Sequence, residues 1–399
     1  MKVLLVSTAW PWPTRKGYQL RLLQLVAALR GEHEVTLLLP EPRRGSSASG
    51  IPAADSSPPR IEMYRRPRSA RPGGVGAALF GGRSLESGLF ESADLRRRLG
   101  ELGARFDVVV LQLVRLSGVM AAMREVPWIL DLVDSLSLNL SRRAAFDRFW
   151  MRPLLRFEAR RLAADERRMI AAATSSLLVS ERDRRYLAAS LPENLANRLA
   201  VVPLALAANP QAAPRAVRTD GAIELAITGN LGYFPTARGI RWFLDDVWPG
   251  VARQVPRARL IVAGARPPRG LARRVRSAGG EVVGDPPDLA QILARADLAL
   301  APLLAGSGTP IKLLEALAAG VPAVATPAAA EGLDPALARC LAIPEDAVGW
   351  VTAIRGLVAN PVAARARAEV GRRLVAELHD PVQVARALEG VLRRPQPPR

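Results

Sequence analysis

The chain has 399 residues, carries a formal net charge of +19 and contains a single cysteine, Cys340. One cysteine excludes an intramolecular disulfide and a metal site built from several thiolates, and the two histidines, His33 and His379, leave few candidates for histidine-rich metal sites or Ser-His-Asp chemistry. The length predicts two or three domains. The charge favours anionic partners such as nucleic acid, an acidic membrane surface or phosphorylated substrates, and the composition of a GC-rich genome explains it equally well.

Membrane spans and targeting signals are not expected. No apolar run approaches the ~18 residues that a membrane span needs. The apolar opening, residues 1–6, is too short for the core of a signal peptide and leads directly to Pro11 and Pro13. We therefore expect a cytoplasmic protein, and we leave open peripheral contact with an anionic membrane at its inner face.

The N-terminal half alternates predicted strands and helices, as doubly wound α/β domains do. An apolar strand leads through a Pro- and Gly-containing loop at 8–17 to an amphipathic helix, and a second strand follows. Two stretches rich in Pro, Ser, Gly and Arg, 41–59 and 65–76, predict long loops. The elements expected in this half are strands at 2–7, 34–39, 107–112, 128–133, 175–179 and 200–203, and helices at 18–30 and 84–104.

Residues 141–172 form an amphipathic segment that we expect to break at Pro153. Nine arginines face four acids between Arg142 and Arg168. The favoured interpretation is that the apolar stripe packs on the domain and the arginines form a solvated face; the alternative is contact with an anionic membrane surface. The stripe consists of Phe146, Phe149, Trp150, Leu154, Phe157 and Leu162.

A non-periodic stretch rich in Ala and Pro, residues 205–220, predicts an interdomain linker. The βα alternation restarts after it, so a second doubly wound domain is expected, with a ligand cleft between the carboxyl ends of the strands of the two domains. The elements expected in this half are strands at 223–228, 259–263, 281–283, 297–303 and 323–326, and helices at 238–254, 289–295, 310–319, 347–378 and 381–393.

Residues 297–326 are one strand–loop–helix–strand unit whose glycine-containing loop runs into a helix N-terminus. We predict Thr309 as the N-cap and Pro310 as the first helical residue. Such a terminus binds anions through its free N–H groups and dipole, and Lys312 adds a positive charge in the first turn. Glu315 shares a helix face with Lys312 and suits a hydroxyl-bearing group. The alternative is an ordinary βαβ unit in which the two side chains form an exposed ion pair.

Several common catalytic motifs are absent from the sequence. It has no G-x-x-x-x-G-K-[ST] phosphate loop, no G-x-G-x-x-G fingerprint after a strand, no H-E-x-x-H and no Cys-x-x-Cys. An Asp-x-Asp pair, which would let two carboxylates hold a metal against a diphosphate, is also absent. We therefore expect phosphate to be bound by backbone N–H groups with Lys or Arg, and no metal or other cofactor. Aromatic residues make up only 5% of the chain, which argues against nucleic acid as a partner.

The order and spacing of these segments resemble the retaining GT-B glycosyltransferases of group one, and most closely the bacterial exopolysaccharide-type sugar transferases. The similarity covers nearly the whole chain. Its motifs are the opening strand, loop and helix followed by His33-Glu34-Val35-Thr36, then Val179-Ser180-Glu181, Thr228-Gly229-Asn230-Leu231, and Gly306-Ser307-Gly308-Thr309 with Lys312, Glu315 and Gly320-Val321-Pro322.

This resemblance implies an α/β fold of the GT-B class, with two tandem Rossmann-like doubly wound domains facing each other across a cleft. Residues 1–205 are the expected N-terminal acceptor domain, on which the C-terminal helix 381–394 packs back. Residues 206–380 are the expected nucleotide-sugar donor domain.

The resemblance also implies a donor site. Glu315 matches the family glutamate that binds the ribose hydroxyls of the donor. Lys312, with the amides at Gly308 and Thr309, would hold the diphosphate and stabilise the charge on the leaving group, which makes Lys312 a catalytic candidate. Ser307 of the same loop is a further donor-binding candidate.

Further donor contacts are implied at strand ends and in the first loop. Gly229 and Asn230 lie where the family places a phosphate-contacting loop, and Gly264 ends the strand beside the nucleotide base. Gly17 matches the glycine that lets the first loop approach the donor phosphate.

The sequence departs from the family pattern at several positions. Ser307 stands where the family often has the first of two glutamates eight positions apart. Asn230 replaces a common arginine, so that Lys312 and Arg238 would carry the phosphate charge. Asp134 follows the strand end at which relatives often have a histidine, and it either orients the acceptor or caps a loop. Leu204 follows Pro203 where Asn-Gly is usual.

The implied activity is transfer of a sugar from a nucleotide-diphosphate donor to a glycan, lipid-linked or small-molecule acceptor, with retention of configuration and without a metal. Two alternatives stay open: a nucleotide-sugar epimerase or hydrolase on the same scaffold, and a non-catalytic protein that binds nucleotide-sugar or an anionic polymer.

Overall fold

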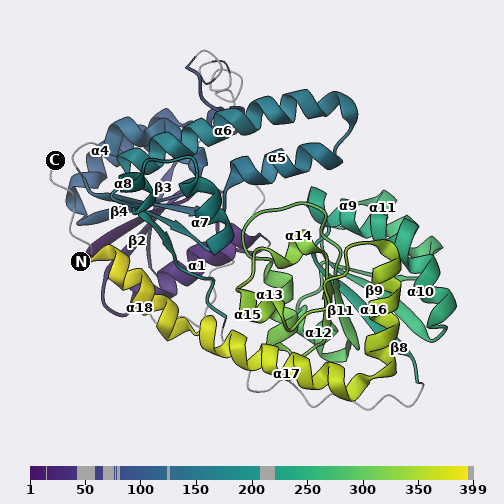
Figure 1. The fold of residues 1–399 in the computed structure, drawn as a ribbon. Helices are drawn as coiled ribbons and strands as arrows, with labels where there is room; N and C mark the ends of the chain where they lie inside the picture. The colour runs from purple at the N-terminus through teal and green to yellow at the C-terminus, as the bar shows by residue number, and fades with distance from the viewer. Residues whose placement is uncertain are drawn as a thin grey trace. The chain divides into compact units, whose positions relative to one another are not determined.

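The computed structural model describes residues 1–14, 16–42, 59–65, 76, 78, 81–123, 126–206 and 221–393. The chain divides into two compact units, one made of Met1–Leu204 with Pro381–Arg399 and the other of Ala205–Asp380 (Figure 1). Most of the predicted loops at 41–59 and 65–76 and of the predicted linker at 205–220 lies outside the described residues.

Within the described part of the first unit, seven strands form one parallel sheet in the order β3-β2-β1-β4-β5-β6-β7. The strand order reverses between β1 and β4, which is the position where ligands bind to doubly wound sheets. The strands are β1 (Lys2–Val6), β2 (Glu34–Pro40), β3 (Arg60–Tyr64), β4 (Val108–Gln112), β5 (Trp128–Val133), β6 (Ser175–Leu178) and β7 (Leu199–Val201).

Helices cover both faces of this sheet (Figure 1). The single helix predicted at 84–104 is wrong, because the side chain of Ser92 accepts a hydrogen bond from the backbone N–H of Leu95 and starts a second helix there. The helical segments with described bounds in this unit are α1 (Gly17–Leu29), α3 (Leu85–Phe90), α4 (Ala93–Leu102), η1 (Gly103–Arg105), η2 (Val114–Met123), α5 (Leu136–Phe146), η3 (Phe149–Met151), α6 (Arg152–Ala172), α7 (Glu181–Ala188), α8 (Glu193–Ala196) and α18 (Pro381–Leu392).

The segment at 141–172 differs from both parts of its prediction. Its break lies at 147–151, and Pro153 sits in the first turn of α6, where its missing N–H costs no hydrogen bond. The predicted packing of the apolar stripe is also wrong for most of its members. Leu162 is buried, whereas Phe149 is 80% exposed and Trp150 57% exposed, with Phe146, Leu154 and Phe157 exposed as well.

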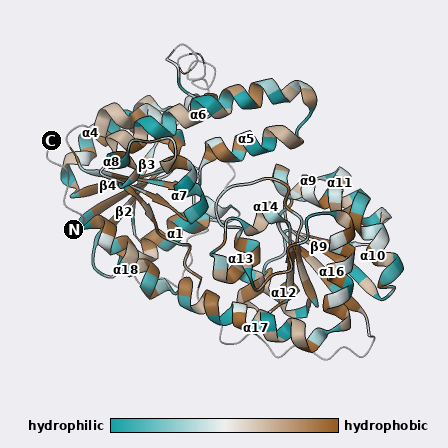
Figure 2. Ribbon diagram, in the orientation of Figure 1, coloured by the Kyte–Doolittle hydropathy of each residue, from teal (hydrophilic) through white to brown (hydrophobic). Residues whose placement is uncertain are grey.

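The second unit contains a five-stranded parallel sheet in the order β10-β9-β8-β11-β12 among its described residues. Side chains alternate between its two faces: Leu298 and Leu300 of β11 enter one core, and Ala299 and Ala301 enter the other. The strands of both sheets are accordingly hydrophobic along most of their length (Figure 2). The strands are β8 (Ile223–Asn230), β9 (Ala258–Ala265), β10 (Glu281–Gly284), β11 (Leu298–Ala301) and β12 (Ala323–Ala325).

The first helix of this unit begins earlier than predicted. The sequence analysis placed it at 238–254, but α9 already begins at Phe234, and a π-helical segment, η4, joins it to α10. Pro235 in the first turn accounts for the early start. The helical segments are α9 (Phe234–Trp242), η4 (Phe243–Val247), α10 (Trp248–Gln254), α11 (Arg269–Ser277), α12 (Ala290–Arg295), α13 (Ile311–Ala318), α14 (Pro327–Ala330), α15 (Pro335–Ala338), α16 (Ala347–Ala359) and α17 (Pro361–Leu378).

The C-terminal helix α18 packs on α1 in the first unit, as the resemblance implies. The His33 ring nitrogen Nε2 lies 2.7 Å from Oε2 of Glu389 and ties the helix to the turn before β2. No single helix in the described part of the chain is long and apolar enough to cross a membrane. Among the described helices, one pair, Ala347–Ala359 and Pro361–Leu392, reaches the length and apolar composition of a membrane span when its two helices are taken together, and it is bent by 101°.

Candidate functional site

The second sheet has its topological switch point between β8 and β11, its first and fourth strands in sequence order. Gly229 and Gly264 end neighbouring strands there, with φ angles of 128° and 152°. A Cβ atom at Gly264 would lie 1.7 Å from the carbonyl oxygen of Gly229. Only glycine therefore permits this close contact of the two strand ends.

Lys312 lies over the end of β8. Its Nζ donates a hydrogen bond to Oγ1 of Thr236 at 3.2 Å, and a Cβ at Gly229 would lie 3.2 Å from both Cε and Nζ of the lysine. Burial lowers the pKa of Lys312 to about 8. The structure thus brings one desolvated ammonium group to the carboxyl edge of the sheet, beside the first turns of α9 and α13.

Glu315 lies one turn further along α13 and is half-buried. Burial raises its pKa to about 7; the charge of Lys312 opposes the increase and that of Asp288 adds to it. Because both side chains are half-buried and desolvated, the alternative of an ordinary exposed ion pair is wrong. A group that provides hydroxyls to Glu315 and an anion to Lys312 would recover part of the solvation that both lose.

The glycine loop before α13 has a backbone that favours glycine at two positions, Gly306 with φ 150° and Gly308 with φ 68°. The predicted N-cap at Thr309 is wrong. Its Oγ1 donates to the carbonyl oxygen of Gly332 at 2.9 Å, and α13 begins at Ile311 with Pro310 in the N-cap position. Thr309 therefore fastens the loop to the segment after β12. Ser307 lies in the same loop and is half-buried.

Two further predicted donor residues, Asn230 and Arg238, lie at the end of β8 and on α9. The side-chain oxygen of Asn230 accepts a hydrogen bond from the N–H of Gly232 at 3.1 Å and so shapes the turn after β8. Arg238 is half-buried on α9, two residues after Thr236, and residues at this spacing do not share a helix face.

The first unit places Gly17 and Asp134 at the carboxyl edge of its own sheet. Gly17 is exposed as the first residue of α1, and Asp134 is half-buried after β5, next to Val133 with φ 65°. A positive φ at a β-branched residue is strained, and such strain concentrates at functional sites. The strained backbone of Val133, together with the position of Asp134, therefore marks the end of β5 as a candidate for an acceptor-binding role.

Sequence reasoning missed a buried ion pair beneath this edge. Nε of Arg21 lies 3.4 Å from Oδ1 of Asp131, both side chains are fully buried, and Arg21 also donates to the carbonyl oxygen of Pro203 at 3.0 Å. Burial raises the pKa of Asp131 against the opposing charge of Arg21. An arginine on the apolar face of α1 was the available signal, since arginine is rarely buried unless paired.

Thr236 was also missed as a partner of Lys312. Pro235 marks a first helical turn, and this turn follows directly on the loop after Gly229. The proline was therefore a signal that Thr236 would lie at the strand end.

Two domain models match the chain. A model described as glycosyl transferase 4-like domain matches residues 16–205, and one described as glycosyl transferases group 1 matches residues 222–360. None of the curated proteins matches the sequence.

Solved structures share the fold over nearly the whole chain. HepE (Alr3699) of Anabaena in complex with UDP is 14% identical, with a TM-score of 0.67 and coverage of 98% of this chain and 99% of that one. Sucrose-phosphate synthase of Thermosynechococcus elongatus is 16% identical, with a TM-score of 0.73 and coverage of 99% and 98%. The alpha,alpha-trehalose-phosphate synthase (UDP-forming) of Burkholderia vietnamiensis is 13% identical, with a TM-score of 0.66 and coverage of 98% and 100%.

The paired parallel α/β sheets and the two domain matches, which together span most of the sequence, lead to one conclusion: the chain belongs to the group 1 glycosyltransferases and has the GT-B fold.

Proposed function

We propose that this glycosyltransferase transfers a hexose from a UDP-sugar to a sugar-containing acceptor, and that the donor diphosphate binds at the β8–β11 edge of the second unit. The observation that carries the proposal is the position of Lys312, a desolvated cation over the glycine end of β8 and beside the N-terminus of α13. A diphosphate would meet there an ammonium group, the N–H groups of a helix start and a glycine surface that allows close approach. The relatives described with UDP and UDP-glucose support UDP as the nucleotide.

Lys312 would act on the leaving group. As the bond between the anomeric carbon and the diphosphate oxygen breaks, negative charge grows on that oxygen, and a cation fixed at this position stabilises the charge. Glu315 would accept hydrogen bonds from the two ribose hydroxyls and fix the position of the nucleotide. We include in the proposal retention of configuration, which the family resemblance implies. We also include independence from a metal, because Lys312 and the N-terminus of α13 place positive charge beside the diphosphate.

The acceptor side is assigned to the first unit. Asp134 would orient the acceptor hydroxyl at the carboxyl edge of the first sheet. The positive φ of Val133, the residue before it, turns the backbone at the end of β5. A glycan, a lipid-linked sugar and a small sugar phosphate all carry such a hydroxyl.

The test is thermal shift with a panel of UDP-, GDP-, ADP- and dTDP-sugars, followed by incubation of the stabilising donor with glycan, lipid-linked and sugar-phosphate acceptors. We expect stabilisation by a UDP-sugar, a product in the presence of EDTA, and an anomeric proton coupling in the product that matches the donor. Stabilisation by no nucleotide-sugar, together with retention on heparin or DNA, would contradict the proposal in favour of a non-catalytic anion-binding protein.

A further inference from the structure

The turn between α5 and α6 exposes a cluster of bulky apolar side chains that we call the hairpin tip: Phe146, Phe149, Trp150, Leu154 and Phe157. Phe149 is 80% exposed and Trp150 57% exposed. Figure 1 shows α5 and α6 side by side, with this turn at the end farthest from the sheet of their unit. The tip is thus an exposed apolar group of side chains at the end of the hairpin that lies away from the sheet of its unit.

The charged groups around the hairpin tip are almost all positive at the surface. Arg148, Arg152, Arg156 and Arg160 are exposed, and the guanidinium of Arg148 lies 5.8 Å from the centre of the Trp150 ring. The aromatic cluster therefore sits within a group of cations.

The acids of the same segment are turned inward and neutralise little of this surface charge. Glu158 accepts hydrogen bonds from the N–H groups of Leu85 and Glu86, and Glu166 accepts them from the hydroxyls of Ser135 and Ser137. Asp147, at the turn itself, accepts a hydrogen bond from Nε of Arg143 at 2.9 Å.

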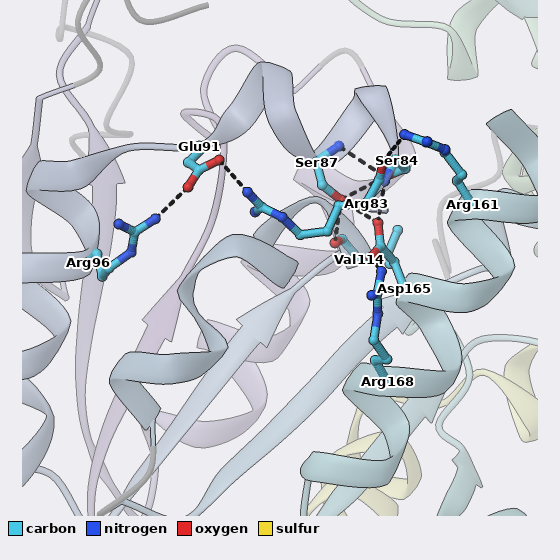
Figure 3. A network of polar contacts seen from close by, with 9 residues as sticks. All are labelled: Arg83, Ser84, Ser87, Glu91, Arg96, Val114, Arg161, Asp165 and Arg168. Atoms are coloured by element: carbon cyan, nitrogen blue, oxygen red, sulfur yellow. Dashed lines mark hydrogen bonds and ion pairs between the residues drawn. The ribbon is translucent and has the colours of Figure 1, made fainter. Parts of the chain in front are cut away.

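The other end of the hairpin is fixed to the domain by a buried polar network. Asp165 of α6 accepts hydrogen bonds from the N–H of Ser84 and the hydroxyl of Ser87, and Arg168 pairs with its second oxygen (Figure 3). Arg161 donates to the carbonyl oxygen of Arg83 at 2.9 Å. Because its base is fixed in this way, the hairpin can present its tip without reorganisation.

We propose that the hairpin tip docks on an anionic lipid bilayer, with the aromatic side chains in the headgroup region and the arginines against the lipid phosphates. Trp and Phe within a basic surface are the combination that binds membrane interfaces. A second copy of the chain is a poorer fit, because a self-complementary contact would bring the same arginines together. Single-stranded nucleic acid binds in basic grooves, whereas these side chains lie at the turn of a helical hairpin.

The experiment is sedimentation of the full chain with phosphatidylcholine vesicles, with and without phosphatidylglycerol, at low and high salt. We expect binding only to the anionic vesicles, weakened by salt. F149S/W150S and a triple change of Arg148, Arg152 and Arg156 to Gln should each lower the vesicle affinity by about tenfold or more, because each removes one part of the interfacial attraction. Both variants should retain the melting temperature and the circular dichroism spectrum of the wild type, which shows that they fold.

The matched controls lie in the second unit. V362S changes an apolar side chain that is also 80% exposed, and a triple change of Arg269, Arg273 and Arg276 to Gln removes the same number of charges from α11. Both controls should bind vesicles as the wild type does. Equal loss in the controls, unchanged vesicle affinity of F149S/W150S, binding to DNA in place of vesicles, or a concentration-dependent dimer that F149S/W150S abolishes would each overturn the proposal.

Discussion

The Nζ atom of Lys312 donates a hydrogen bond to Oγ1 of Thr236 at 3.2 Å, although 76 residues separate the two in sequence. This bond joins the first turn of α13 to the first turn of α9 across the end of β8. It fixes the lysine at the switch point of the sheet, and the proposed donor site depends on it.

Replacement of Lys312 by Met should weaken the binding of UDP without lowering the stability of the fold. A charge-assisted contact to phosphate contributes ~1.5–3 kcal/mol, so K312M should weaken UDP binding by about 10- to 100-fold. The free energy of unfolding should stay within about 1 kcal/mol of the wild type or rise, because the lysine is desolvated before ligand binds. Calorimetric titration with UDP and chemical unfolding measure the two quantities. A large loss of stability with unchanged affinity would assign Lys312 a purely structural role.

The affinity for UDP should depend on pH in both directions. Lys312, with a pKa of about 8, loses its proton as pH rises through that value, and the contact to the diphosphate weakens. Glu315, with a pKa of about 7, gains a proton as pH falls through that value and accepts hydrogen bonds from the ribose less well. We therefore expect tightest binding between these two values.

Two variants test the origin of this pH profile. K312R keeps its charge at high pH and should remove the alkaline decrease in affinity. E315Q should remove the decrease in affinity at acid pH. The part of that decrease that comes from protonation of UDP itself should remain, because it is the same for the wild type and E315Q. A profile that is identical in wild type and both variants would contradict the assignment.

Gly264 should tolerate no side chain. Its Cβ would lie 1.7 Å from the carbonyl oxygen of Gly229, in a backbone conformation with φ 152° that strains any L-residue. G264A should lower the stability by more than ~3 kcal/mol and abolish UDP binding, because the end of β8 must move. G270A is the control, since a Cβ at Gly270 in α11 would meet no atom outside its own stretch of helix within 4 Å, and alanine should be neutral or stabilising there. A G264A variant that binds UDP normally would show that the strand ends can separate without loss of the site.

Loss of one member of the buried pair Arg21 and Asp131 should lower the stability more than replacement of both members by apolar residues. D131A leaves an uncompensated buried guanidinium and should cost about 3–5 kcal/mol, whereas the double change R21M/D131L should cost much less or nothing. Chemical unfolding measures both. For comparison, E369Q removes the solvent-accessible partner of Arg372 and Arg373 and should change the stability little. Equal costs for D131A and the double variant would mean that the pair itself stabilises the fold.

Much of the fold follows from local patterns. Apolar runs bounded by Gly, Pro and polar residues predicted most of the strands to within a few residues, because strands buried on both faces are continuously hydrophobic. The strand β3 was not predicted, since its five residues, RIEMY, are half polar and lie between two loop-like stretches. The start of α9 was missed because its first turn, Phe234 to Ala237, contains Pro235 and resembles a loop by composition.

The candidate site was only partly predictable. The spacing of Lys312 and Glu315 predicts a shared helix face. The contacts of Lys312 with β8 and α9 were not predictable from this spacing, because both elements lie far away in the sequence. The exposure of Phe149 and Trp150 could not be predicted from the sequence either. Helical periodicity identifies an apolar stripe but does not show whether another element of the fold covers it.

The most direct test of the donor site is calorimetric titration of UDP into wild type and E315A at a pH between the pKa values of the two site residues. We predict binding to the wild type and an affinity about tenfold or more lower for E315A, since two hydrogen bonds to a carboxylate are lost, with the melting temperature maintained. Equal affinities in the two proteins, or no binding of UDP, GDP, ADP or dTDP to the wild type, would contradict the account.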